Sequence, residues 1–133
     1  MRVARHEPIS VARIWELARS GDLRGATDAA RRGLAQAGGN PRRGVELRLA
    51  IASCAMRQGL HPDALCELDA ASRTAAGAGA VMHVEAWRAE LAYFQGRYSA
   101  AEDAIGKLLP QLVARRDWAY AAFESWNVHR LVR

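Results

Sequence analysis

Residues 21–26 read GDLRGA, residues 59–64 read GLHPDA and residues 96–101 read GRYSAA. In each stretch a glycine is followed five residues later by an alanine, and the three glycines lie 38 and 37 residues apart. A period in this range is typical of stacked helical hairpins, in which each hairpin buries its apolar face only against its neighbours. The repeat therefore predicts an all-α array of antiparallel helical hairpins, an architecture that usually serves as a docking surface.

Apolar residues at helical spacing lie on both sides of each glycine, so each copy marks the turn of one hairpin. The pattern predicts hairpins over residues 10–37, 44–76 and 81–114 and a last helix over residues 117–132. No second helix follows the last one, which gives seven helices, or three and a half hairpins, in a single domain over residues 1–133. An array that stops in mid-hairpin indicates that the chain is part of a longer protein.

Each repeated glycine is expected to end the first helix of its hairpin, because glycine readily adopts the left-handed conformation found there. Ala26, Ala64 and Ala101 are expected where the two helices of a hairpin cross, since a close crossing excludes bulky side chains. Pro110 predicts a bend near Lys107, because an interior proline removes a helical hydrogen bond. The side chains expected to cap helix N-termini are Ser10, Asp22, Ser99 and Asp117.

The composition is that of a helical globular domain, with 28 alanines, four prolines and a hydrophobic share of 50% in 133 residues. The net charge of +5 lies in residues 1–43, which hold nine arginines and four acidic residues. Two interpretations stay open: a solvated face on the first hairpin, or a surface for an acidic partner or a nucleic-acid backbone. The second interpretation would centre on Arg31, Arg32, Arg42 and Arg43.

Several classes of function are not favoured by the sequence. No histidine or cysteine pattern matches a metal site, no glycine-rich loop follows a strand, and no local motif marks a nucleophile. We therefore expect that the protein is not an enzyme and has no catalytic residue, metal or cofactor. The two cysteines form no disulfide framework, and no apolar run is long enough for a leader or a membrane span. These features predict a cytoplasmic protein.

The stretch AYFQGRYSAA at residues 92–101 resembles the turn and second helix of the tetratricopeptide repeat, or TPR. The stretches around Gly21 and Gly59 are similar to it, and the resemblance covers about residues 8–131. It implies a right-handed superhelix in which the first helix of every hairpin lines a concave groove. Residues 47–52 and 64–71 also resemble the repeats of actinobacterial CHAT-domain proteins, which precede a caspase-like protease domain. That second resemblance implies a sensor or regulatory arm of a larger bacterial signalling protein.

On the TPR register, one face of the first helices would bind a peptide or helix of a partner protein. Arginines on this face would form charge-assisted bonds to carboxylates, while Trp15 and Phe94 would either supply apolar anchors or fill the core. The alternative function is nucleic-acid association within a transcriptional regulator, through the basic first hairpin. The residues expected in the groove are Trp15, Arg19, Ser53, Arg57, Glu90, Phe94, Asn127 and Arg130.

The last helix is apolar on most sides, whereas a terminal helix in such an array is expected to have a polar outer face. We interpret its aromatic residues as a surface that is covered by the next helix of a longer array, by a partner or by a second copy of the chain. The residues expected in self-association are Trp118, Tyr120, Phe123 and Trp126.

Overall fold

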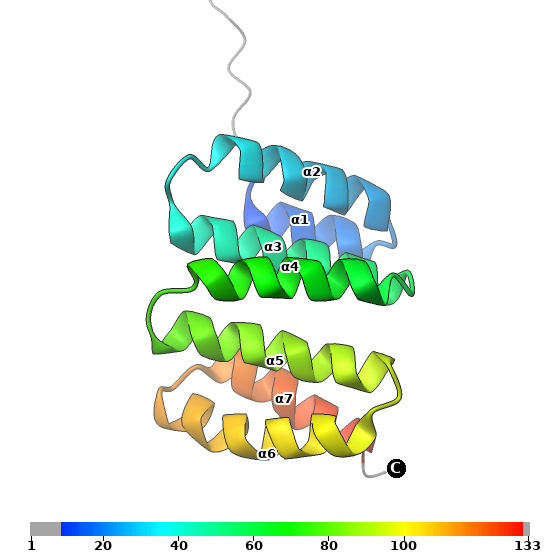
Figure 1. Ribbon diagram of the computed structural model, residues 1–133, viewed down its shortest axis with the longest axis vertical. Coiled ribbons are helices and arrows are strands. Elements are labelled where there is room, and N and C mark those ends of the chain that lie inside the picture. Colours follow the sequence, from blue (N-terminus) through cyan, green and yellow to red (C-terminus); the bar gives the residue numbers. More distant parts are fainter. Residues whose placement is uncertain (1–8, 132–133) are drawn as a thin grey trace, which may run out of the picture.

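The computed structural model describes the backbone of residues 9–131, and the side chains of this range except those of Ala78 and residues 125–131. All regular secondary structure in the described part is α-helical (Figure 1). Within residues 9–131, no helix combines the length and the apolar character that a bilayer span requires. The helices are α1 (Val11–Arg19), α2 (Leu23–Gln36), α3 (Pro41–Arg57), α4 (His61–Thr74), α5 (Ala78–Phe94), α6 (Tyr98–Ala114) and α7 (Trp118–Leu131).

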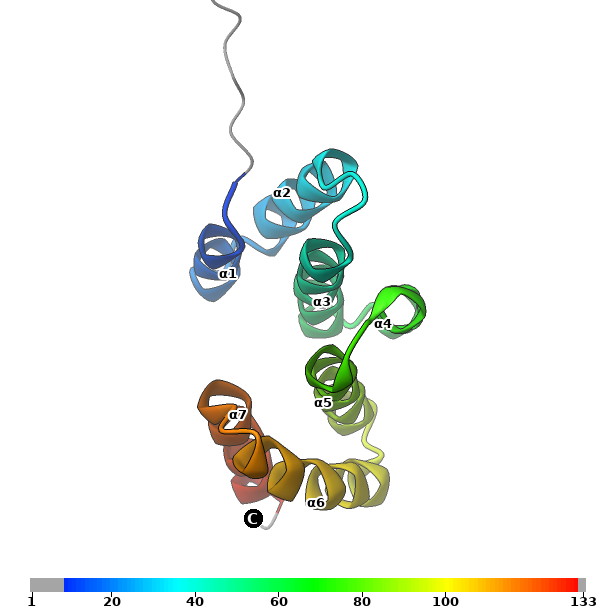
Figure 2. The same ribbon diagram turned by 90° about the vertical axis from the view of Figure 1, so that its left-hand side faces the viewer.

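Helices that follow one another in the chain pack side by side, and each odd-numbered helix also contacts the next odd-numbered helix. Figure 2 shows the consequence, a curved array with α1, α3, α5 and α7 on its inner side and α2, α4 and α6 on its outer side. Because the direction of the chain reverses at every turn, the odd-numbered helices all begin at the same end of the array (Figure 1). Their first turns therefore lie near one another.

The apolar core consists of three clusters, each shared by three consecutive helices. The first joins α1, α2 and α3 around Ile14 and Leu47, and the second joins α3, α4 and α5 around Leu49 and Leu68. The third joins α5, α6 and α7 around Leu112. Helices α3 and α5 each belong to two clusters, so the packing passes along the array from neighbour to neighbour, as in repeat proteins.

The three repeated glycines form the hairpin turns as predicted. Gly21, Gly59 and Gly96 have φ angles of +94°, +76° and +77°. In each turn the glycine N–H and the next N–H donate to carbonyl groups in the last turn of the preceding helix, which is the Schellman arrangement. The alanines expected at the crossings are confirmed as buried, with 0% exposure at Ala26, Ala64 and Ala101.

Three of the four expected N-caps are confirmed. The side chains of Ser10, Asp22 and Asp117 accept hydrogen bonds from the backbone N–H three residues later, at 3.1, 2.9 and 3.5 Å. The prediction for Ser99 is wrong, because α6 begins at Tyr98 and Ser99 lies inside its first turn.

Three prolines lie within helices, and Pro41 and Pro110 bear on the predicted helix bounds. Asn40 caps α3 and Pro41 fits its first turn, so α3 begins three residues before the expected position. Helix α6 continues through Pro110 to Ala114. Pro110 is exposed, so water can reach the carbonyl group that it leaves without a helical partner.

Arg116 occupies the place of the glycine in the turn between α6 and α7. Its N–H donates to Val113, and the next N–H donates to Leu112, as in the glycine turns. Its φ of +58° is unfavourable for a residue with a side chain. We expect Arg116→Gly to raise the free energy of unfolding by about 0.5 kcal/mol, since the relief of strain exceeds the entropy cost of glycine. Urea denaturation followed by circular dichroism measures this.

The equivalent position in the α5–α6 turn provides the matched control. Gly96→Ala should lower the free energy of unfolding by about 1 kcal/mol, because alanine is strained at a positive φ. A loss of stability in Arg116→Gly would contradict the assignment of strain to this turn.

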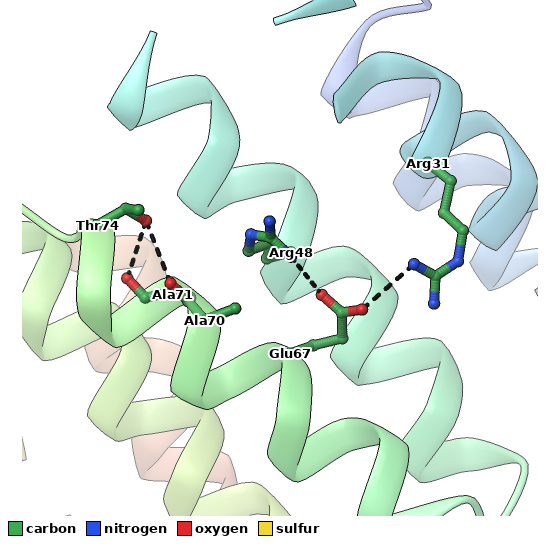
Figure 3. A network of polar contacts seen from close by, with 6 residues as sticks. All are labelled: Arg31, Arg48, Glu67, Ala70, Ala71 and Thr74. Atoms are coloured by element: carbon green, nitrogen blue, oxygen red, sulfur yellow. Dashed lines mark hydrogen bonds and ion pairs between the residues drawn. The ribbon is translucent and has the colours of Figure 1, made fainter. Parts of the chain in front are cut away.

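Ion pairs tie the outer helices to the inner ones. Glu67 of α4, which is only 9% exposed, accepts from Arg48 of α3 at 3.0 Å and pairs with Arg31 of α2 at 3.3 Å (Figure 3). Arg88 of α5 donates to Asp69 of α4 at 3.0 Å. One buried carboxylate therefore joins the first two hairpins, and an arginine joins the second hairpin to the third.

Candidate binding site on the inner side

Five aromatic rings from three odd-numbered helices form a continuous cluster on the inner side, which we call the inner aromatic cluster. Trp15 of α1 stacks on Trp87 of α5, with ring centroids 5.5 Å apart. Trp87 also contacts Phe123 of α7 at 4.9 Å, and His83 of α5 stacks on Tyr120 of α7 at 3.7 Å. The cluster thus connects the first, third and last hairpin elements of the array across its inner side.

Tyr120 combines this packing with a polar contact. The indole N–H of Trp87 donates to its hydroxyl oxygen at 3.2 Å, which leaves the hydroxyl proton for donation. Burial raises the pKa of Tyr120 to about 12; the hydrogen bond from Trp87 acts against this, and nearby carboxylates, Asp117 first, add to it. The hydroxyl therefore stays protonated at neutral pH and offers a donor to a ligand.

A cavity of about 680 Å³ lies beside the inner aromatic cluster, at the end of the array where the odd-numbered helices begin. Its apolar wall includes Trp15, Val45, Leu49, Ala80 and Tyr120, which come from all four inner helices. The volume falls in the range of ordinary ligand pockets, and a mostly apolar wall with a few polar groups is typical of them.

Charged groups surround this cavity, and most of them are paired. Arg42 lies 3.7 Å from Glu46, and the His83 ring nitrogen lies 2.5 Å from a carboxylate oxygen of Asp117. Arg115, from the turn before α7, also lines the cavity. Among the side chains that the structure describes, none forms an ion pair with Arg115. Among the residues that line the cavity, Arg42 and Arg115 carry a positive charge and Glu46 carries a negative one.

The chain was compared with protein families, curated proteins and solved structures. No family model matches the chain, and no curated protein or solved structure is significantly similar to it.

The structure distributes the expected groove residues over several places. Trp15 belongs to the cavity wall and to the inner aromatic cluster. Arg19, Arg57 and Phe94 are exposed, but each is the last residue of its helix and lies at the end of the array opposite the cavity. The side chains of Asn127 and Arg130 lie outside the described residues.

Two further expected groove residues require correction. Ser53 and Glu90 are buried, with 4% and 7% exposure, so they offer almost no surface to a ligand. The register of the resemblance placed them on the open face. In the structure, each odd-numbered helix contacts the next one directly, so less of its surface is open than the resemblance implied.

The expectation for α7 also changes. Tyr120 and Phe123 pack against α5 inside the chain, which satisfies the apolar surface assigned to self-association. Trp118 is 60% exposed, as an interaction surface requires. The side chain of Trp126 lies outside the described residues.

His83, Trp87 and Tyr120 were not predicted from the sequence as components of the inner side. One signal that points to them is the distribution of aromatic residues: eight of the nine lie in odd-numbered helices, and only Tyr98 lies in an even-numbered one. An excess of large rings on one side of a helical array indicates the side where a wide space has to be filled.

The four arginines of the basic first hairpin do not act as one group. Arg31 pairs with Glu67, and Arg43 donates to the carbonyl oxygen of Ile9 at 2.9 Å. Arg42 lines the cavity on the inner side. Three of the four are therefore engaged in different parts of the fold.

Proposed function

We propose that the chain is a cytoplasmic interaction module that binds a peptide segment of a partner protein on the inner side of its array. The observation that carries this proposal is the cavity of about 680 Å³ with an aromatic and aliphatic wall from four helices. Large apolar side chains inserted into such pockets supply most of the binding energy in protein interfaces. The cytoplasmic setting is supported by the two free cysteines.

The proposal includes a TPR-like right-handed superhelix. It is supported by the left-handed conformation of the three repeated glycines, by the burial of the alanines at the crossings and by the position of the odd-numbered helices on the inner side. The resemblance to CHAT-protein repeats extends the proposal to a sensor or regulatory arm of a larger bacterial protein. We do not propose nucleic-acid binding, because the arginines that would contact a phosphate backbone take part in separate contacts within the fold.

A selection experiment tests the proposal. Random dodecapeptides displayed on phage are selected against the purified chain, and the enriched peptides are measured by fluorescence polarisation. Ala80→Phe places a ring in the cavity, while Ala35→Phe places the same ring on the exposed surface of α2. We expect Ala80→Phe to weaken binding at least about tenfold and Ala35→Phe to leave it unchanged.

Circular dichroism and a thermal melt confirm that both variants fold. The proposal fails if no peptide is enriched over an unrelated helical protein, or if the enriched peptides bind both phenylalanine variants equally well.

A further inference from the structure

We propose that the cavity selects an aromatic side chain directly followed or preceded by an aspartate or glutamate within the bound segment. This inference rests on the proposed function, since it names the partner sequence that the same site takes. It concerns an internal pair of residues and does not require a free chain terminus.

The preference for an aromatic side chain follows from the residues that line the cavity. Trp15 and Tyr120 present ring surfaces, and Val45, Leu49 and Ala80 present small or branched aliphatic groups. Rings that pack against rings gain about 0.5–1.5 kcal/mol beyond the area that they bury. Aromatic side chains also lose little conformational entropy on binding, because they have only two rotatable bonds. A phenylalanine, tyrosine or tryptophan therefore fits this space better than a flexible aliphatic chain.

The preference for a neighbouring aspartate or glutamate follows from the charged side chains around the cavity. Glu46 is balanced by Arg42 and Asp117 by His83, so the existing carboxylates have cationic or hydrogen-bonding partners. Arg115 has no such partner among the described side chains.

The position of Arg115 places its charge at the cavity. One guanidinium nitrogen lies 3.5 Å from the position that a Cβ atom would take on Gly79, another residue of the cavity wall. A carboxylate next to an inserted ring would lie within reach of this guanidinium and would form charge-assisted hydrogen bonds with it. A lysine or arginine in the same place would be repelled by the like charge of Arg115.

Arg116 supplies a matched control. It carries the same charge on the adjacent residue but is not part of the cavity wall. Arg115→Gln and Arg116→Gln therefore remove one positive charge each, and only the first removes it from the site.

The experiment uses the peptides from the phage selection, synthesised with acetylated N-termini and amidated C-termini so that no terminal carboxylate is present. Replacing the aromatic residue by alanine should weaken binding at least about tenfold. Replacing the neighbouring acid by its amide should weaken it about fivefold, as expected for a charge-assisted bond that is partly exposed to water. Arg115→Gln should abolish the difference between acid and amide peptides, and Arg116→Gln should preserve it.

The outcomes separate this inference from the proposed function. Peptides that depend on an open cavity but lack the aromatic–acidic pair overturn the inference and leave the proposed function in place. The same holds if the acid and amide peptides bind alike, or if Arg116→Gln removes their difference as fully as Arg115→Gln. If no peptide depends on the cavity, the proposed function fails and this inference fails with it.

Discussion

Trp87→Ala should lower the free energy of unfolding by about 3 kcal/mol, the largest effect that we expect from a single substitution on the inner side. Trp87 stacks on Trp15, contacts Phe123 and donates a hydrogen bond to Tyr120, so its removal breaks the inner aromatic cluster at its centre. The loss includes apolar burial, ring packing and the unpaired Tyr120 hydroxyl. Urea denaturation followed by far-UV circular dichroism measures the change.

Trp118→Ala is the matched control, because Trp118 is 60% exposed. Its replacement should change stability by less than about 0.5 kcal/mol. A double-mutant cycle between Trp15 and Trp87 isolates the stacking contact and should give a coupling energy of about 1 kcal/mol. Equal losses in Trp87→Ala and Trp118→Ala would refute the central position assigned to Trp87.

Glu67→Ala should lower the free energy of unfolding by about 2 kcal/mol. This is less than the usual loss when a buried charge pair is broken, because both arginines can turn toward water. The Glu67 side chain is 11% exposed, whereas those of Arg31 and Arg48 are 56% and 33% exposed. Removing the carboxylate disconnects α4 from α2 and α3 at this point. Chemical denaturation at low and high salt gives the value, and burial should leave most of it at high salt.

The exposed pair between Arg13 and Glu16 provides the comparison, since both side chains are more than half exposed, at 59% and 55%. Glu16→Ala should cost no more than about 0.5 kcal/mol, and salt should abolish that effect. Glu67→Gln keeps the shape and one acceptor, so its loss should lie between those of the two alanine variants. If Glu67→Ala costs no more than Glu16→Ala, the buried carboxylate does not hold the hairpins together.

The local signals of the chain were sufficient for the hairpins and their turns. Gly21, Gly59 and Gly96 ended helices because only glycine adopts a positive φ without strain, and this depends on a few adjacent residues. Ser10 and Asp22 capped helices for an equally local reason, since each bonds to a backbone N–H three residues away. Periodicity therefore predicted the number of helices and their order.

The candidate site could be predicted only in part. Trp15 was expected on the inner side, and the structure places it there. Arg19 and Arg57 lie at helix ends far from the cavity, because the register of a repeat predicts which face is inward but not where along that face a space remains. That space depends on the sizes of side chains from four helices at once.

Only the tertiary structure decided which distant residues meet. Trp15 and Trp87 are 72 residues apart in the chain, and their contact arises from the curvature that the packing of the odd-numbered helices imposes. The pairing of Glu67 with Arg48 has the same origin, as does the lack of an ion-pair partner for Arg115 among the side chains that the structure describes. Helix formation depends on neighbours within four residues, whereas a cavity and its charge depend on how whole helices pack against one another.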